Sequence, residues 1–310
     1  MNAVEAFLKR DMRETLRRIT FPLPEEQTGQ GFKPNAYIRF LRRVARALIV
    51  LMRLNGRNRF SNELIQLLDP TLSVAVPGGE QLVFRMGHGR LLWRAKTFQS
   101  DEPMMMEWVG RFSPADCFYD VGANIGSYSL YAAKRGVRTF AFEPEFMNLQ
   151  LLYENIFLNR VQELCTPIPI GLGASTSLEL LYLKESLSKG DALHGIGRKS
   201  YMLGNPSTST LRLHVLTARL DDLIEAFQLP PPTKLKIDVD GNELQVLRGA
   251  MNTLDGVEDV HLEVDDAQEE SREAMELLEQ KGFHLVGKDP NPLPWRGPNL
   301  WNGLFSRSAS

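Results

Sequence analysis

The chain has 310 residues, of which 43% are hydrophobic and 24% are charged, and its formal net charge is −2. These values are ordinary for a soluble globular protein and fit one large α/β domain with an extension. The charge is uneven, because residues 1–60 hold 13 Lys and Arg against 5 Asp and Glu, whereas the remainder holds 23 against 33. An acidic main body without a basic patch argues against nucleic acid as a partner.

Residues 1–100 are predicted to form an N-terminal extension that precedes a catalytic domain at 101–310. Helices are expected at 2–19 and 36–57, and the second of these has arginines along one face and apolar residues along the other. Such a helix commonly packs on its own domain, and the alternative is a surface that contacts a membrane or a charged partner. The arginines of this face are Arg39, Arg42, Arg43, Arg46, Arg53 and Arg57.

Alternating residues and two glycine turns predict a small antiparallel meander at 73–76, 81–86 and 91–95, and a helix at 104–111 follows it. The N-terminus carries charges every few residues and has no apolar segment of a signal peptide, which favours the cytoplasm. Cys117 and Cys165 lie in apolar runs, so both are expected to be buried, reduced thiols of an intracellular protein.

Beyond residue 116, strands and helices alternate in a way that predicts a doubly wound, mostly parallel sheet with an antiparallel last strand. The last two expected strands have no helix between them and should therefore run antiparallel to each other. The expected strands are 117–121, 138–142, 163–170, 211–217, 234–239, 259–264, 283–287 and 302–306. The expected helices are 127–135, 145–158, 219–227, 242–254 and 271–281.

The strand expected at 117–121 ends in a turn that contains Gly122, Asn124 and Gly126, and a helix follows at once. Glycine allows the backbone to approach a ligand, and a helix N-terminus presents free N–H groups, so the turn predicts a nucleotide-type site. Glu143 closes the next strand, 21 residues after Gly122, where an acidic residue can accept both hydroxyls of a ribose.

Two features of the turn favour S-adenosylmethionine over NAD as the cofactor. Asp120 lies at the strand end, where its carboxylate would repel a phosphate but attract the ammonium of a methionine moiety. The third glycine of the dinucleotide fingerprint is replaced by Ser127. Asp120 and Asn124 are therefore expected to bind the polar groups of the methionine part, and Gly122 and Gly126 to admit it.

Carboxylates also lie at the ends of two later strands, Asp238 and Asp240 at one and Glu263 and Asp265 at the next. Strand alternation should put each pair on one side of its strand. Ligands of open α/β sheets bind beyond the carboxyl ends of the strands, so Asp238 is the first candidate for a base or cofactor contact and Glu263 the second. These acids could alternatively hold Mg²⁺. His194, in a glycine-bracketed loop, is either a proton acceptor or a solvated loop residue.

Three blocks resemble the signature of FkbM-family methyltransferases, and the resemblance covers roughly residues 100–310. They are Asp120–Gly126, Ala141–Pro144, and Lys236–Glu243 with Leu247–Ala250; the stretch 189–197 also resembles a loop of one FkbM subgroup. One departure is Asp240, where many members have Glu, and it keeps the carboxylate.

The resemblance implies a class I fold that uses S-adenosylmethionine and methylates an oxygen of a sugar, glycan or polyketide-like acceptor. The competing hypotheses are an NAD-dependent oxidoreductase and a non-catalytic scaffold that binds a cofactor.

Overall fold

The computed structural model describes residues 70–86, 89–183, 195–196, 211–290 and 299–307, together with Arg43, Val44 and Ala47. The chain divides into two compact units, Met1–Leu68 and Asp69–Ser310. In the first unit, Arg43, Val44 and Ala47 are helical, which agrees with the helix expected at 36–57, and all three are exposed. The helix expected at 2–19 and the other five arginines of the basic face lie outside the described residues. Within the described residues, no helix has the length and apolar character that crossing a membrane requires.

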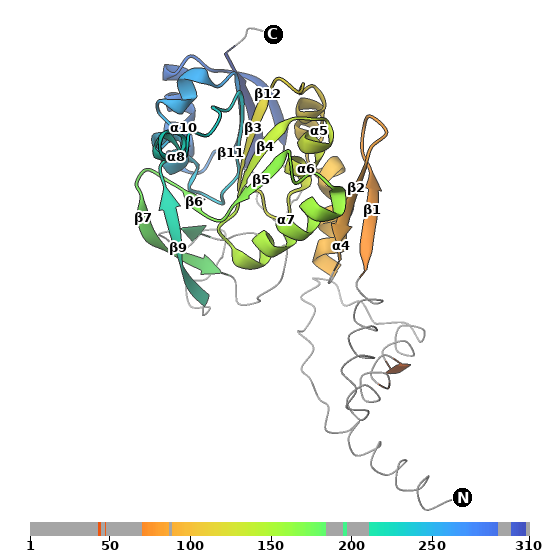
Figure 1. Ribbon diagram of the computed structural model, residues 1–310. Helices are drawn as coiled ribbons and strands as arrows, with labels where there is room; N and C mark the ends of the chain where they lie inside the picture. Colours follow the sequence, from red (N-terminus) through yellow and green to blue (C-terminus); the bar gives the residue numbers. More distant parts are fainter. Residues whose placement is uncertain are drawn as a thin grey trace, which may run out of the picture. The chain divides into compact units, whose positions relative to one another are not determined.

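A seven-stranded sheet forms the centre of the second unit, in the order β12-β13-β11-β10-β3-β4-β5 (Figure 1). The five strands from β11 to β5 pair in parallel, whereas β13 pairs antiparallel with both β11 and β12. The prediction of a mostly parallel sheet with an antiparallel last strand is confirmed. The bounds are Cys117–Val121 (β3), Arg138–Phe142 (β4), Cys165–Ile168 (β5), Lys234–Ile237 (β10), Asp259–Asp265 (β11), His284–Pro290 (β12) and Leu300–Ser306 (β13).

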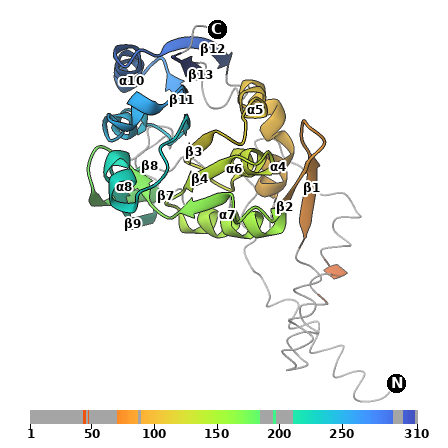
Figure 2. The same ribbon diagram turned by 45° about the horizontal axis from the view of Figure 1, so that its top comes forward.

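Helices cover both faces of this sheet, as both views show (Figures 1 and 2). Successive strand residues point to opposite faces, where two separate apolar cores form, and both β3 and β4 contribute side chains to each core. One core takes α4 (Gly89–Asp101), α5 (Pro103–Gly110), α6 (Ser127–Lys134) and α7 (Phe146–Asn159). The other takes α8 (Leu220–Phe227), α9 (Glu243–Arg248), α10 (Glu269–Gln280) and the 3₁₀ turn η2 (Thr253–Gly256).

The strand predicted at 91–95 is wrong, because these residues belong to helix α4. Leu91, Ala95 and Phe98 recur at helical spacing, and all three are buried in the core that α6 and α7 also line. Only two strands of the expected meander form, β1 (Thr71–Ala75) and β2 (Gln81–Arg85), as an antiparallel hairpin.

Helix α7 supplies the hydrogen bonds that the outer edge of β2 would otherwise lack. The side chain of Asn159 accepts from the backbone N–H of Val83 at 2.9 Å and donates to its carbonyl at 2.7 Å. The side chain of Asn155 accepts from the backbone N–H of Arg85 at 2.7 Å. These bonds join the hairpin to the same compact unit as the sheet, and they cover an exposed strand edge.

A second sheet of four strands, ordered β6-β9-β7-β8, lies beside the first (Figure 2). The strand expected at 163–170 is shorter in the structure, where β5 spans 165–168, and β6 follows it as a separate strand that was not predicted. The strand expected at 211–217 belongs to the second sheet. Strand β7 was not predicted; its Leu178 is exposed, whereas Leu181 and Leu183 are buried, as in a sheet with one solvated face. The bounds are Gly171–Leu172 (β6), Ser177–Leu183 (β7), Gly195–Ile196 (β8) and Leu211–Ala218 (β9).

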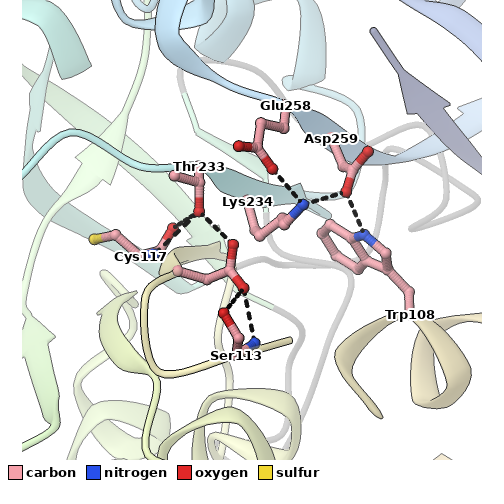
Figure 3. A network of polar contacts seen from close by, with 8 residues as sticks. Trp108, Ser113, Cys117, Thr233, Lys234, Glu258 and Asp259 are labelled. Atoms are coloured by element: carbon pink, nitrogen blue, oxygen red, sulfur yellow. Dashed lines mark hydrogen bonds and ion pairs between the residues drawn. The ribbon is translucent and has the colours of Figure 1, made fainter. Parts of the chain in front are cut away.

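A polar network ties the loops together at the amino ends of β3, β10 and β11 (Figure 3). The Thr233 hydroxyl donates to Asp116 at 3.0 Å and accepts from the Cys117 backbone N–H at 3.0 Å. The Lys234 Nζ donates to Asp259 at 2.6 Å and to Glu258 at 2.9 Å. This end of the sheet is thus closed by hydrogen bonds, and the opposite end is left for a ligand.

The two sheets meet where α9 ends at Gly249. A Cβ at Gly249 would overlap the carbonyl oxygen of Gly173, which follows β6. The carbonyl of Gly249 in turn accepts from the backbone N–H of Asp221, in the first turn of α8. Gly249 is therefore a packing requirement of the fold, because no side chain fits between these two backbones.

We predict that Gly249→Ala destabilises the protein by about 1–3 kcal/mol, because the added methyl forces two backbones apart. A thermal melt should show Tm lowered by roughly 5 °C. Gly256→Ala is the matched control, since a Cβ there meets nothing within 4 Å and its Tm should stay unchanged. Equal melting temperatures for the two variants would contradict the packing argument.

Candidate active site

The turn after β3 is pressed against the end of β10. Gly122 has φ +81°, and a Cβ at this position would overlap the carbonyl oxygen of Asp238. Asn124, two residues later, is also left-handed at φ 52°, and its backbone N–H donates to Glu143 Oε2 at 2.8 Å. The turn therefore contacts the ends of both neighbouring strands, β10 on one side and β4 on the other.

A buried ion pair lies directly beneath this turn. The Lys236 Nζ donates to Asp120 Oδ1 at 2.9 Å, and the Ser129 hydroxyl donates to Asp120 Oδ2 at 2.5 Å. Asp120 and Lys236 are opposite one another in the pairing of β3 with β10, and both are buried. Burial alone lowers the pKa of Lys236, but the carboxylates of Asp120 and Asp238 raise it above its ordinary value, so the lysine stays charged.

Glu143 lies at the end of β4 with 5% of its surface exposed. Its Oε2 accepts from the Asn124 backbone and its Oε1 from the Glu145 backbone, each at 2.8 Å. Burial raises the pKa of Glu143 to about 7, although these two N–H donors act to lower it. Each oxygen retains a lone pair, so the side chain can accept two further hydrogen bonds.

Strand β10 ends at Ile237, earlier than the expected end at 239, and the chain then bends sharply. Asp240 has φ 53° and Gly241 has φ 104°, so the strand alternation expected to place Asp238 and Asp240 on one side is broken. Glu243 holds the bend, because its Oε1 accepts from the backbones of Val239 and Gly241 at 3.1 Å each. Burial raises the pKa of Glu243 to about 7.

A cavity opens at the carboxyl ends of β3, β4 and β10, with about 740 Å³ of space that reaches solvent. Its polar lining includes Gly122, Asn124, Glu143 and Asp238. Its apolar lining comes from both sheets: Val121, Phe142, Ile170, Leu172, Leu181, Ile196 and Val239.

The described lining of the cavity does not include Asp120, Gly126 or Glu263. Asp120 is occupied by Lys236 and Ser129, and Gly126 begins α6 in a left-handed conformation where a Cβ would contact Leu152. Glu263 is buried opposite Asn302 in β13. His194 lies outside the described residues, and it precedes β8, whose Ile196 lines the cavity.

Arg94, on α4, also lines the cavity and was missed because its segment was predicted as a strand. Among the described lining residues it is the one cation, beside the carboxylates of Glu143, Glu145, Asp238 and Asp240. The apolar spacing of Leu91, Ala95 and Phe98 was the signal that could have placed Arg94 on a helix.

The part of the chain that the structure describes contains no cluster of three or more His, Cys, Asp or Glu side chains suited to a metal ion. Two carboxylates close to the strand ends, Glu145 and Glu243, are used within the protein. Glu145 caps α7 by accepting from the backbones of Met147 at 3.1 Å and Asn148 at 2.7 Å. Glu243, as described above, holds the bend after β10.

A family model described as the methyltransferase FkbM domain matches residues 120–285, which is more than half of the chain. The chain belongs to the FkbM methyltransferase family. The resemblance inferred from the three sequence blocks is thereby confirmed, and FkbM-type enzymes use S-adenosylmethionine.

Two curated relatives share about a quarter of their aligned residues with the chain. Hexuronic acid methyltransferase AglP of Haloferax volcanii is 27% identical over 173 residues, which cover 56% of this chain and 66% of AglP. The 31-O-demethyl-FK506 methyltransferase FkbM of Streptomyces tacrolimicus is 27% identical over 198 residues, which cover 57% of this chain and 76% of that protein. The match thus spans just under two thirds of AglP.

Among solved structures, a methyltransferase FkbM from Methylobacillus flagellatus is similar at 18% identity and a TM-score of 0.42. The match covers 62% of this chain and 44% of that one.

The cavity of this FkbM-family chain fits the chemical groups of S-adenosylmethionine. Glu143 offers two carboxylate oxygens for the two ribose hydroxyls. Asp238 and Arg94 supply one charge of each sign, as the ammonium and carboxylate of a methionine tail require. The apolar residues at the ends of β4 and β5 suit the face of a purine.

We predict that the affinity for S-adenosylhomocysteine falls as the pH drops below 7. The raised pKa means that Glu143 takes up a proton near pH 7, and a protonated carboxyl cannot accept both ribose hydroxyls. The affinity should be constant above pH 7.5 and fall by up to about tenfold per pH unit below 7. Isothermal titration from pH 5.5 to 8.5 measures this, with Glu143→Gln as a control whose weaker binding should not vary with pH. Constant wild-type affinity across the range would contradict the assignment of Glu143.

Proposed function

We propose that the protein transfers a methyl group from S-adenosylmethionine to a hydroxyl of a sugar, glycan or polyketide-like acceptor. The observation that carries this proposal is the cavity at the ends of β3, β4 and β10. There Glu143 offers a ribose-binding carboxylate, and Arg94 and Asp238 offer charges of both signs. The printed names of the relatives, a hexuronic acid methyltransferase and an FK506 methyltransferase, support this class of acceptor.

In this proposal the cofactor lies along the strand ends. Glu143 accepts the ribose hydroxyls, Gly122 and Asn124 form the floor of the cavity, and the amino-acid tail extends toward Asp238 and Arg94. Asp238 binds the ammonium, and the Arg94 guanidinium binds the carboxylate in a charge-assisted pair. Asp120 does not contact the tail, because Lys236 and Ser129 already occupy both of its oxygens.

The acceptor hydroxyl needs a base, because an alcohol is a poor nucleophile until its proton is removed. When bound, S-adenosylmethionine supplies an activated, cationic methyl donor. With Asp238 engaged by the ammonium and Glu263 away from the described lining, we assign the proton-accepting role to His194. Its place in the chain supports this, since it lies two residues before Ile196, which lines the cavity from the second sheet.

Small hydroxylated molecules and glycans are the proposed partners, and nucleic acid is not. The support is the charge of the chain after residue 60, where 33 Asp and Glu exceed 23 Lys and Arg. Such a surface repels a phosphate backbone, which depends on Lys and Arg for its binding.

The direct test of the function is transfer of a labelled methyl group into fractionated cell extract, followed by identification of the labelled product. A labelled O-methyl group on a sugar or polyketide-like product is expected. Tighter binding of NAD than of S-adenosylhomocysteine would indicate an oxidoreductase, and binding of S-adenosylmethionine without methyl transfer to any product would indicate a scaffold.

We predict that Arg94→Ala weakens binding of S-adenosylhomocysteine by about 2 kcal/mol, or roughly thirtyfold, because a charge-assisted hydrogen bond is lost. Binding of methylthioadenosine, which lacks the amino-acid tail, should be unchanged. Lys96→Ala is the matched control, since Lys96 carries the same charge on the same helix but is exposed. Isothermal titration of both ligands decides the matter, and equal losses for the two ligands would rule out a contact with the tail.

We predict that His194→Ala lowers kcat by roughly a hundredfold or more, as expected for loss of a general base, while affinity for S-adenosylhomocysteine stays the same. Methyl transfer to the identified acceptor and a parallel titration measure the two quantities. His214→Ala, in the exposed face of β9, is the control. Full turnover by the His194 variant would exclude a proton-accepting role.

A further inference from the structure

The ammonium of Lys236 is shared among three groups at the floor of the cavity. Its Nζ donates to Asp120 Oδ1 at 2.9 Å and to the backbone carbonyl of Gly122 at 3.3 Å, and it lies 3.8 Å from Asp238 Oδ2. The first group is in β3, the second is in the turn after it, and the third follows β10. One side chain thus connects β3, the turn after β3 and the residue that follows β10.

The side chains of Lys236 and Asp120 are 3% and 1% exposed, so neither reaches solvent. Burying two charges is costly, and apolar residues of similar size often give equal or greater stability than a buried ion pair. Stability therefore gives no reason for a lysine at this position. The contact of Lys236 with Asp238, which lines the cavity, does give a reason for a lysine here.

We propose that Lys236, anchored by Asp120, is a positioning residue that fixes the Gly122 turn and the Asp238 carboxylate for the amino-acid tail of the cofactor. The proposal rests on the proposed function, because it assigns that tail to Asp238. Lys236 does not touch the ligand itself. Lys236 instead holds the Gly122 turn and the Asp238 carboxylate, which contact the ligand. Asp120 in turn holds Lys236 in place.

Strand β10 also contains one residue of a matched control pair, Lys234, whose partner Asp259 begins β11. Lys234 is two residues before Lys236 on the same face of β10, and its Nζ donates to Asp259 at 2.6 Å. This pair lies at the amino ends of the strands, in the network of Figure 3, and neither residue lines the cavity. The side chains are also mostly buried, at 13% and 16% exposed. Neutralising the Lys234–Asp259 pair removes one charge of each sign from the same sheet, at the end of the strands opposite the cavity.

The experiment compares the double variants Asp120→Asn/Lys236→Met and Asp259→Asn/Lys234→Met in the full chain. Both remove one charge of each sign, so neither changes the net charge. Each protein is titrated with S-adenosylhomocysteine and with methylthioadenosine, which keeps the nucleoside and lacks the tail. The Asp120/Lys236 variant should bind S-adenosylhomocysteine at least tenfold more weakly and methylthioadenosine within twofold of wild type. The Asp259/Lys234 variant should bind both as wild type does.

Two results would overturn the proposal. The first is an Asp120/Lys236 variant whose affinities for S-adenosylhomocysteine and methylthioadenosine keep the wild-type ratio, whether or not both are weaker. That result would mean that the pair serves the fold alone. An equal change of that ratio in the Asp259/Lys234 variant means that the effect is not local. Failure of the proposed function is distinct, because wild-type protein would then bind neither ligand. If the Asp120/Lys236 variant does not fold, Lys236→Arg, which keeps the charge but not the geometry, must show the same selective loss.

Discussion

The site depends on the close approach of two backbones, the turn at Gly122 and the carbonyl of Asp238. No side chain fits between them, and the Asp120–Lys236 ion pair locks the same two strands together immediately below. Because of this contact, two sequence blocks more than a hundred residues apart form one continuous floor. The turn also bonds to Glu143 on its other side, so three strand ends are fixed relative to each other before any ligand arrives. Pre-organisation of this kind reduces the entropy cost of binding.

Acidic groups surround that floor at a cost to the fold. Glu143 and Glu243 are both buried and accept backbone N–H bonds, and burial raises the pKa of each to about 7. Such a pKa means that ionisation is less favourable in the folded protein than in the unfolded chain. Each of these two groups therefore lowers the stability of the folded protein as the pH rises from about 4.5 to 7. Glu243 serves the backbone by holding the bend after β10. Glu143 has remaining acceptor capacity, and that capacity is what a ribose needs.

Sequence patterns predicted the main sheet well, because each buried parallel strand is a short apolar run between helix and turn signals. They failed where local patterns are ambiguous: 91–95 alternates like a strand but forms α4, and β7 has the irregular apolar spacing of a half-exposed strand. The glycine turn and Glu143 were placed at the cavity by spacing alone. The burial of Asp120 was not foreseen, although Lys236, in a strand that must be buried, already required a carboxylate partner. Arg94 could not be found without the correct assignment of its helix.

We propose that one cavity at the ends of β3, β4 and β10 holds the methyl donor along its whole length. A crystal structure with S-adenosylhomocysteine tests it most directly. The account predicts both ribose hydroxyls on Glu143, and the homocysteine tail between Asp238 and Arg94 above the Gly122 turn. A nucleoside bound elsewhere, or a ribose that does not contact Glu143, would contradict it.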